Sequence, residues 1–338
     1  MKRFLCCLGL CAVTALAGAP EDWARVQALD AGPGGNPKSA EEAKQLSLDH
    51  TAKQEKALRA FLTAYPTEDH AFEARLRLAR VLGLRAEMNG EAMSSEVSRL
   101  IQEAERAAAS PEQKAEVDFA RLAQRMRQSR GKRPTPEERE RLLTAARAFQ
   151  REHPTDRRVA AVLVEVGTLF DGDSKNKERL LADAKRLTKD PDLLSQIADD
   201  TKRLAWLGRQ LPLRFTGVDG SRVDVKDWRG KPVVVVFFAT SSAPSRLVFA
   251  DLNQLAAEKG AGFVAVSLDD DTDALGRFLA TQKPRPAVAC DGKGWNGPFV
   301  QALGINAVPT VWLLDKEGVV RTLDPLDDPA GLLRQLLR

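Results

Sequence analysis

Two hydrophobic patterns divide the chain. From Ser39 to about Gly208, apolar residues recur at helical spacing among many Ala, Leu, Arg and Glu residues, without strand-like alternation. From Leu211 onward, short runs of β-branched and aromatic residues alternate with glycine-containing turns. The patterns therefore predict an α + α/β architecture, with an all-helical hairpin array followed by a mixed sheet flanked by helices.

The helical region carries start signals and a loose internal repeat. Three helix starts match the capping box, in which Ser or Thr precedes Glu or Gln by three residues: Ser39, Ser110 and Thr135. The segments around Pro66 and Pro154 resemble each other and lie 154 − 66 = 88 residues apart. This spacing fits two helical hairpins per copy, as in a tetratricopeptide-type array. A plain helical bundle remains open as the alternative.

The C-terminal third predicts a sheet of mixed direction. The expected strands are 213–215, 222–225, 233–238, 263–268, 286–290, 310–314 and 319–323, and the expected helices are 242–258, 272–280 and 329–337. Strand 233–238 is apolar throughout, as a central strand covered on both faces should be. A helix separates it from strand 263–268, so these two strands should be parallel. Strands 310–314 and 319–323 should pair antiparallel.

The first residues have the pattern of a secretory signal peptide. A positive start at Lys2 and Arg3 precedes an apolar stretch that ends in a small-x-small cleavage site at Ala17. We expect a signal peptide over 1–17, a flexible spacer over 18–38, a helical domain over 39–208 and a C-terminal domain over 209–338. The mature protein is then exported, to the periplasm or outside the cell.

Cysteine usage supports an exported chain without an internal disulfide. Cys6, Cys7 and Cys11 lie within the predicted signal peptide, so only Cys290 remains after cleavage. A lipid anchor on Cys11 is disfavoured, because the preceding Leu10 is too large for a lipoprotein box.

The charge of the chain argues against a nucleic-acid partner, and its hydropathy argues against a transmembrane segment. The net charge is only +4, and 15 Lys and Arg balance 15 Asp and Glu between Leu211 and Arg338. A nucleic-acid-binding domain would instead carry a clustered basic face. No second long apolar run follows the signal, which argues against a transmembrane segment in the mature chain. We therefore expect an exported protein or peptide as the partner.

Three motifs in the C-terminal domain agree with one family. They are the Asp219-Gly220 turn followed by residues 227–231, the Phe238-Ala239-Thr240 approach to a turn, and residues 304–310 followed by 313–318. Together they resemble the thioredoxin-like superfamily, in particular its exported TlpA-type and redoxin branch. The resemblance implies a cis peptide bond before Pro309 and a docking surface for extended peptides beside it.

The same resemblance shows a degenerate active site. Ser242 and Ser245 occupy the positions of the two family cysteines, and Val236 replaces a buried acid. Disulfide exchange requires a thiolate, and a serine hydroxyl does not ionise near pH 7. A nucleophilic serine would need a base, but the three histidines, His50, His70 and His153, lie in the helical region. We expect Ser241 or Ser242 to cap the following helix instead.

Two functional hypotheses follow. In the first, the domain is redox-inactive at the usual site and binds peptide or protein through Val308, Pro309 and Thr310, with Ser241 and Ser242 beside them. In the second, it is a thiol-disulfide oxidoreductase or peroxiredoxin-type redoxin that works through Cys290, although the peroxiredoxin Cys motif is missing. The alternative is a purely structural role, in which Cys290 is a small buried hydrophobic residue.

We expect neither a metal nor a cofactor. Asp269, Asp270, Asp271 and Asp273 do not follow the EF-hand spacing, and carboxylates at a helix start are explained by the helix dipole. The scattered histidines and cysteine offer no zinc pattern.

Overall fold

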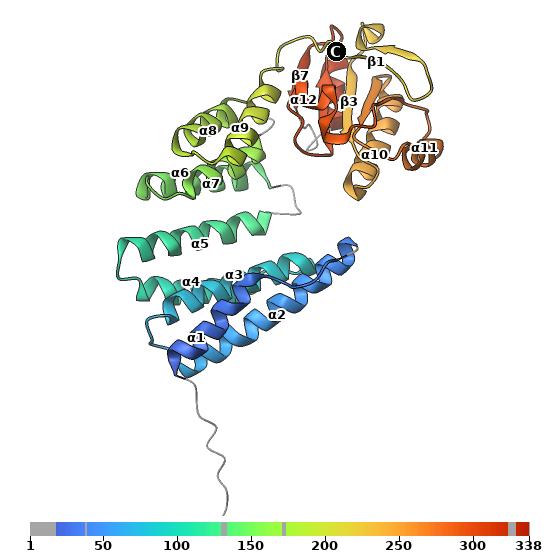
Figure 1. Ribbon diagram of the computed structural model, residues 1–338. Helices are drawn as coiled ribbons and strands as arrows, with labels where there is room; N and C mark the ends of the chain where they lie inside the picture. The colour runs from blue at the N-terminus through green and yellow to red at the C-terminus, as the bar shows by residue number, and fades with distance from the viewer. Residues whose placement is uncertain (1–17, 38, 130–133, 171–173, 324–328, 338) are drawn as a thin grey trace, which may run out of the picture. The chain divides into compact units, whose positions relative to one another are not determined.

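A computed structural model describes residues 18–37, 39–129, 134–170, 174–323 and 329–337 (Figure 1). The chain divides into two compact units, Met1–Lys132 and Arg133–Arg338. The predicted signal peptide, with Cys6, Cys7, Cys11 and the cleavage site at Ala17, lies outside the described residues. None of the described helices combines the length and apolarity needed to cross a bilayer.

Among the described residues, helices are the regular elements of the first unit and of the start of the second. In the first unit they are α1 (Ala19–Ala28), η1 (Leu29–Ala31), α2 (Ala40–Ala64), α3 (Ala71–Asn89), α4 (Ser95–Ala107) and α5 (Pro111–Ser129). In the second they are α6 (Pro136–Glu152), α7 (Val159–Gly167), η2 (Thr168–Phe170), α8 (Ser174–Leu187) and α9 (Pro191–Leu204). The predicted capping contacts are confirmed. The hydroxyls of Ser39, Ser110 and Thr135 each accept a hydrogen bond from the main-chain amide three positions later in the chain.

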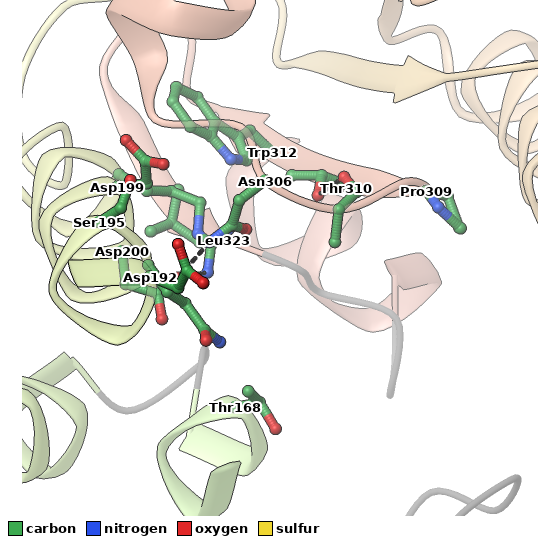
Figure 2. Close-up of a pocket in the computed structure, with 13 residues that line it drawn as sticks. Thr168, Asp192, Ser195, Asp199, Asp200, Asn306, Pro309, Thr310, Trp312 and Leu323 are labelled. Carbon is green, nitrogen blue, oxygen red and sulfur yellow. Dashed lines mark hydrogen bonds and ion pairs between the residues drawn. The ribbon is translucent and has the colours of Figure 1, made fainter. Parts of the chain in front are cut away.

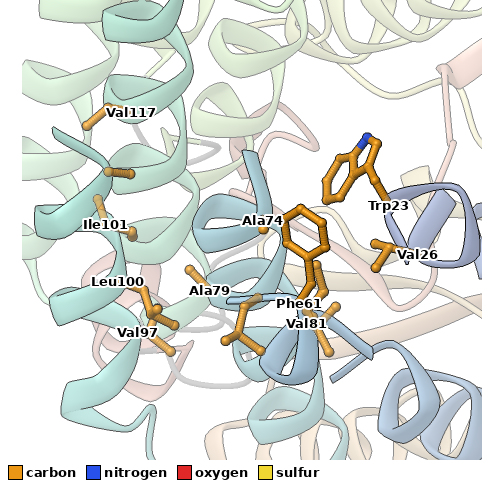
Figure 3. Close-up of a cluster of buried hydrophobic side chains, with 13 residues drawn as sticks. Trp23, Val26, Phe61, Ala74, Ala79, Val81, Val97, Leu100, Ile101 and Val117 are labelled. Atoms are coloured by element: carbon orange, nitrogen blue, oxygen red, sulfur yellow. The ribbon is translucent and has the colours of Figure 1, made fainter. Parts of the chain in front are cut away.

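Helix α1 corrects the prediction of a flexible spacer over 18–38. Its Trp23 and Val26 are buried in the core of the first unit (Figure 3). The Trp23 indole stacks on the His70 ring at 4.6 Å and meets the Phe61 ring at 5.1 Å. The glycines and prolines that indicated a spacer begin only at Gly32, whereas Trp23 and Val26 are spaced three apart as on one helix face.

The internal repeat is visible in the backbone of two turns, one in each unit. Tyr65 ends α2 with φ −133° and ψ 61°, and His153 ends α6 with φ −130° and ψ 58°. The Tyr65 amide donates to the Phe61 carbonyl at 2.8 Å, and the His153 amide donates to the Phe149 carbonyl at 2.9 Å. The two segments that resemble each other in sequence therefore adopt the same turn. The wider tetratricopeptide assignment stays a prediction.

A five-stranded mixed sheet follows α9. Its strands are β3 (Val233–Phe238), β4 (Gly262–Ser267), β5 (Ala287–Cys290), β6 (Thr310–Leu314) and β7 (Val320–Leu323), in the order β5-β4-β3-β6-β7. A separate hairpin pairs β1 (Arg214–Thr216) with β2 (Arg222–Asp224). The helices are η3 (Val225–Trp228), α10 (Ala243–Lys259), α11 (Thr272–Ala280), η4 (Gly294–Asn296), α12 (Pro298–Leu303) and α13 (Pro329–Leu337).

The predicted sheet is confirmed. β3 runs parallel to β4 and antiparallel to β6, and every residue of β3 is buried. Val234, Val236 and Phe238 face a core cluster that includes side chains of α10, α11 and α13. On the opposite face the ring of Phe237 meets the Trp312 indole at 5.5 Å. The short helix α12 was not predicted.

Candidate functional site

The Ser242 turn joins β3 to α10. Ser242 is the N-cap residue of α10, and its Oγ accepts a hydrogen bond from the Ser245 amide at 3.3 Å. Ser245 is fully buried, and its own Oγ has no hydrogen-bond partner among the described residues. Ser241 is exposed. Of the two serines considered for the cap, Ser242 therefore takes that role, and its hydroxyl is used in holding the start of the helix.

A buried carboxylate, which the sequence analysis assigned to a helix start, braces this turn. Asp269 is 6% exposed, and its Oδ1 accepts from the Thr240 amide at 2.8 Å and from the Thr240 hydroxyl at 2.7 Å. Its Oδ2 accepts from the Ser267 hydroxyl at 2.6 Å. The helix-start explanation holds for Asp271, which caps α11, but not for Asp269. The sequence did contain one signal for this role, because Asp269 directly follows a strand predicted to be buried.

Cys290 lies at the same edge of the sheet. It ends β5 opposite Ser267 of β4, and its thiol donates to the Asp269 carbonyl at 3.4 Å. Cys290 is half-buried and packs against the core cluster on the α10 side. The structure thus brings it to the residue that braces the turn, while leaving part of it open to solvent.

The Pro309 loop lies beside the end of β3 that leads to the Ser242 turn. Thr310 begins β6 and pairs with Phe237, the penultimate residue of β3. The Val308–Pro309 peptide bond is cis, as the resemblance implied. The Thr310 hydroxyl donates to the Ala307 carbonyl at 2.7 Å, which closes the loop on itself. Val308 and Pro309 are half-buried and Ala307 is exposed. The predicted binding residues therefore gather at one end of the sheet.

A cavity of about 480 Å³ opens next to this loop (Figure 2). One wall is formed by the β6 side of the sheet and the loop before it, and the other by α9. The lining residues are Thr168, Asp192, Ser195, Gln196, Asp199, Asp200, Arg203, Asn306, Ala307, Pro309, Thr310, Trp312 and Leu323. Only Pro309 and Thr310 were among the predicted site residues. The α9 residues could not be found, because nothing in their sequence shows that this helix packs against α12 and the loop that follows it.

Polar contacts hold α9 against the loop that precedes Pro309. Asp200 Oδ1 accepts a hydrogen bond from the Arg203 guanidinium at 2.5 Å and another from the side-chain amide nitrogen (Nδ2) of Asn306 at 3.1 Å. Arg203 also donates to Asn306 Oδ1 at 2.7 Å. The buried Lys177 ammonium lies 3.6 Å from the same Asp200 oxygen. Opposite charges and shared hydrogen bonds thus offset the cost of burying these groups.

Gly304 allows the close approach. It ends α12 with φ +71°, and a Cβ there would lie 2.3 Å from the Asp199 carbonyl oxygen of α9. A larger residue would meet both a disfavoured conformation and a backbone clash. The two walls of the cavity are therefore in direct contact at one end.

Comparison with known proteins supports the family assignment. The family model Redoxin matches residues 207–335. The C-terminal domain belongs to the redoxin branch of the thioredoxin-like superfamily. This redoxin domain is 30% identical over 118 residues to the thiol-disulfide oxidoreductase ResA of Bacillus thuringiensis subsp. konkukian, a match that covers 34% of the chain and 66% of that relative. The corresponding ResA of Bacillus anthracis is 29% identical over the same length.

Solved structures include similar proteins. A putative thiol:disulfide interchange protein DsbE from Chlorobium tepidum is 32% identical, with a TM-score of 0.33, over 39% of this chain and 94% of its own. A thiol-disulfide oxidoreductase from Bacteroides fragilis is 21% identical, with a TM-score of 0.35, over 38% of this chain and 100% of its own. Helix α9 precedes the matched region, so one wall of the cavity lies outside the redoxin domain.

Proposed function

We propose that this protein is exported and that its redoxin domain binds an extended peptide or protein segment without redox turnover. The observation that carries the proposal is the Ser242 turn. A hydroxyl stands at each thiol position, one of them serving as a helix cap and the other buried. Neither group can supply the thiolate that disulfide exchange requires.

The Pro309 loop supplies the binding geometry. Among the described residues, the main-chain N–H and C=O of Val308 have no hydrogen-bond partner, while pairing with β3 begins at Thr310. An extended segment that pairs with Val308 would satisfy these groups, as in strand addition to a sheet. Function resides in the site rather than the fold, so the likeness to oxidoreductases does not decide the chemistry.

Two measurements test the proposal. The purified chain should not reduce insulin disulfides, with or without alkylation of Cys290. In a labelled protein, a capped heptapeptide of alternating Thr and Ala should shift the amide resonances of Val308 and Thr310. Thr310→Val removes the hydroxyl that closes the loop and should weaken this binding by about fivefold, the equivalent of one neutral hydrogen bond.

Thr322→Val is the matched control. Thr322 lies on the neighbouring strand β7, is half-buried where Thr310 is buried, and does not line the cavity. It should bind the heptapeptide as the unsubstituted chain does. If neither resonance moves on peptide addition, or if both variants bind equally, the loop is not the docking surface.

A second candidate function is a thiol-dependent oxidoreductase that works through Cys290. The observation that favours it is the half-buried thiol at the same edge of the sheet as the Ser242 turn. In this case the purified chain reduces or exchanges disulfides, and alkylation or Cys290→Ser abolishes that activity. Activity that survives alkylation would contradict both candidate functions.

Export after Ala17 is part of the proposal and has its own test. Expression of the whole sequence in a bacterium with a periplasm should yield a product that begins at Gly18, as measured by intact mass of the osmotic-shock fraction. An uncleaved product retained in the cytoplasm would contradict it.

A further inference from the structure

The Pro309 loop, residues 306–309, is held by side chains rather than by its own main chain. Among the described residues, no main-chain amide or carbonyl of 306–308 pairs with another main-chain group. The last such bond before the loop runs from the Ile305 amide to an α12 carbonyl at 3.0 Å. Pairing with β3 begins only at Thr310. The conformation of the loop therefore depends on contacts that side chains make.

Among the described residues, two side-chain hydrogen-bond contacts anchor the loop, one near each end. The Thr310 hydroxyl donates to the Ala307 carbonyl at 2.7 Å, within the redoxin domain itself. The Asn306 carboxamide instead reaches α9, where its Oδ1 accepts from Arg203 at 2.7 Å and its Nδ2 donates to Asp200 at 3.1 Å. One of the two anchors therefore comes from a helix that precedes the redoxin match.

The α9 anchor is a buried charged group. Asp200 is 2% exposed and Arg203 is 7% exposed, and their side chains meet at 2.5 Å. The fully buried Lys177 ammonium lies 3.6 Å from the same Asp200 oxygen. Separating a buried ion pair leaves uncompensated charge, which is strongly unfavourable, so these side chains are held in one arrangement. Asn306 therefore bonds to a partner that is itself fixed.

Main-chain contacts fix α9 relative to the sheet as well. The segment after α9 runs beside β7, where Gly208 donates to the Val320 carbonyl and Val320 donates to the Arg209 carbonyl, each at 2.9 Å. A Cβ on Gly304 would lie 2.3 Å from the Asp199 carbonyl oxygen, so α9 and the end of α12 meet main chain to main chain. The position of the loop anchor thus follows from the position of α9.

We infer that α9 positions the Pro309 loop. Asp200 and Arg203 are positioning residues, because they act on the loop through Asn306. A loop that is ordered before binding loses less conformational entropy when a peptide pairs with Val308. The effect on affinity rests on the proposed peptide binding, whereas the order of the loop is a property of the free protein. The recognition unit then includes α9 and extends beyond the redoxin match.

Asn306→Ala removes both hydrogen bonds to α9 and leaves the pair of Asp200 with Arg203 in place. In the labelled full chain without peptide, the main-chain amide order parameters of Ala307 and Val308 should fall from about 0.85, typical of rigid backbone, to below about 0.6. The Thr/Ala heptapeptide should bind about tenfold more weakly, as expected when the backbone of one residue must be ordered on binding. Unchanged order parameters in this variant would overturn the inference.

An exchange of the two side chains tests whether the contact is direct. Asn306→Asp keeps an acceptor for Arg203 but sets a second carboxylate against Asp200, so the loop should lose order. In the double variant Asp200→Asn with Asn306→Asp, the carboxamide and the carboxylate exchange positions, and the net charge equals that of the unsubstituted chain. Loop order and peptide affinity should both recover, because a donor again faces an acceptor. A folded double variant that is no better ordered than Asn306→Asp would refute the contact as the cause.

Lys202→Ala is the matched control. Lys202 precedes Arg203 on α9, forms an exposed ion pair with Asp199 at 3.2 Å, and does not line the cavity. Alanine keeps the Cβ that lies beside Gly304. Loop order and peptide binding should both match those of the unsubstituted chain. An equal loss of loop order in Lys202→Ala and Asn306→Ala would mean that the effect is not specific to the Asn306 contact, and would overturn the inference.

The two readouts separate failure of this inference from failure of the proposed function. If Asn306→Ala loosens the loop but the heptapeptide does not bind even the unsubstituted chain, peptide docking fails and the role of α9 in ordering the loop stands. If both chains bind the heptapeptide equally and their order parameters agree, α9 does not position the loop, while docking stands. A loosened loop that binds with unchanged affinity would show that loop order does not serve docking, and would also overturn the inference.

Discussion

The Ser242 turn and the Pro309 loop meet at the same end of the sheet but differ in what they leave available. In the turn, one hydroxyl caps α10 and the other is buried, so the side chains serve the fold. In the loop, main-chain groups of Val308 have no partner among the described residues, and a cavity adjoins it. The serines at positions 242 and 245 cannot supply a thiolate, whereas the proposed peptide surface is built from backbone and does not depend on sulfur.

The difference has a local physical cause. Replacement of sulfur by oxygen at positions 242 and 245 changes two atoms, while the path of the turn is held by Asp269 through Thr240. The backbone frame of the proposed peptide site therefore does not depend on the two thiols. The following predictions challenge that contrast, beginning with the largest effect.

Restoring both thiols should reverse the chemical loss. In the double variant Ser242→Cys with Ser245→Cys, the new thiol at position 242 would stand at the N-terminus of α10. Helix N-termini and the Cys-x-x-Cys arrangement lower a thiol pKa below its usual value of about 8.5. We expect disulfide reduction to appear from a background without activity, measured as insulin reduction. The single variant Ser242→Cys, which lacks a resolving thiol, is the control. A double variant that forms the internal disulfide but never turns over would show that the turn no longer has catalytic geometry.

Removing the brace should cost the most stability. Asp269→Ala leaves Thr240 and Ser267 without a buried acceptor, and hydrogen bonds to a charged group contribute about 1.5–3 kcal/mol each. We expect the free energy of unfolding to fall by about 3 kcal/mol, measured by urea denaturation. Asp270→Ala is the control, because Asp270 is the exposed neighbour and should change stability by less than about 0.5 kcal/mol. Equal stability of the two variants would mean that Asp269 does not hold the turn.

Acid should weaken the opposite end of β6. Burial would raise the pKa of Asp315, but hydrogen bonds from the Val319 amide, the Arg321 guanidinium and the Glu317 amide outweigh it and lower the pKa below its usual value. A lowered pKa in the folded state gives stability that is present above the unfolded pKa of about 3.9 and is lost as pH falls below it.

Asp315→Asn should therefore be less stable than the unsubstituted chain at pH 7, and the difference should shrink below about pH 3.9. Thermal unfolding at a series of pH values measures this. A difference that stays constant across the series would show that the Asp315 carboxylate does not contribute through its charge.

The cap itself should have the smallest effect. Ser242→Ala removes the hydroxyl that accepts from the Ser245 amide and should lower stability by about 1 kcal/mol, as is usual for helix N-caps. Ser242→Gly should lower the free energy of unfolding by only about a few tenths of a kcal/mol. Ser241→Ala, at the exposed neighbouring position, provides the baseline in thermal unfolding. If Ser241→Ala destabilises more than Ser242→Ala, the cap has been assigned to the wrong serine.

Much of the fold could be predicted because it depends on local pattern. The uninterrupted apolar run 233–238 is a fully buried central strand, and the segment between it and 263–268 is the connecting helix. Helix α1 was missed because the turn residues after it dominated the interpretation of the segment. Helix α12 is only six residues long, too short for a periodic pattern.

The candidate site divides in the same way. Ser242 and Pro309 could be placed by their motif, because both are set by residues adjacent in sequence. The support of Thr240 by Asp269 joins residues 29 positions apart, and the contact of Arg203 with Asn306 joins residues 103 positions apart. Such contacts depend on how elements pack, and no spacing along the chain records that.

The order of the residues is enough to establish most of the strands and helices, the two serines at the positions of the family thiols, and the proline loop that follows. Each of these depends on the chemistry of neighbouring side chains and on short-range sterics. The packing of α9 against α12 and the Asn306 loop, and the cavity that it borders, are decided by the tertiary structure. Packing brings together side chains from distant parts of the chain, and only their shapes and charges in three dimensions decide which of them meet.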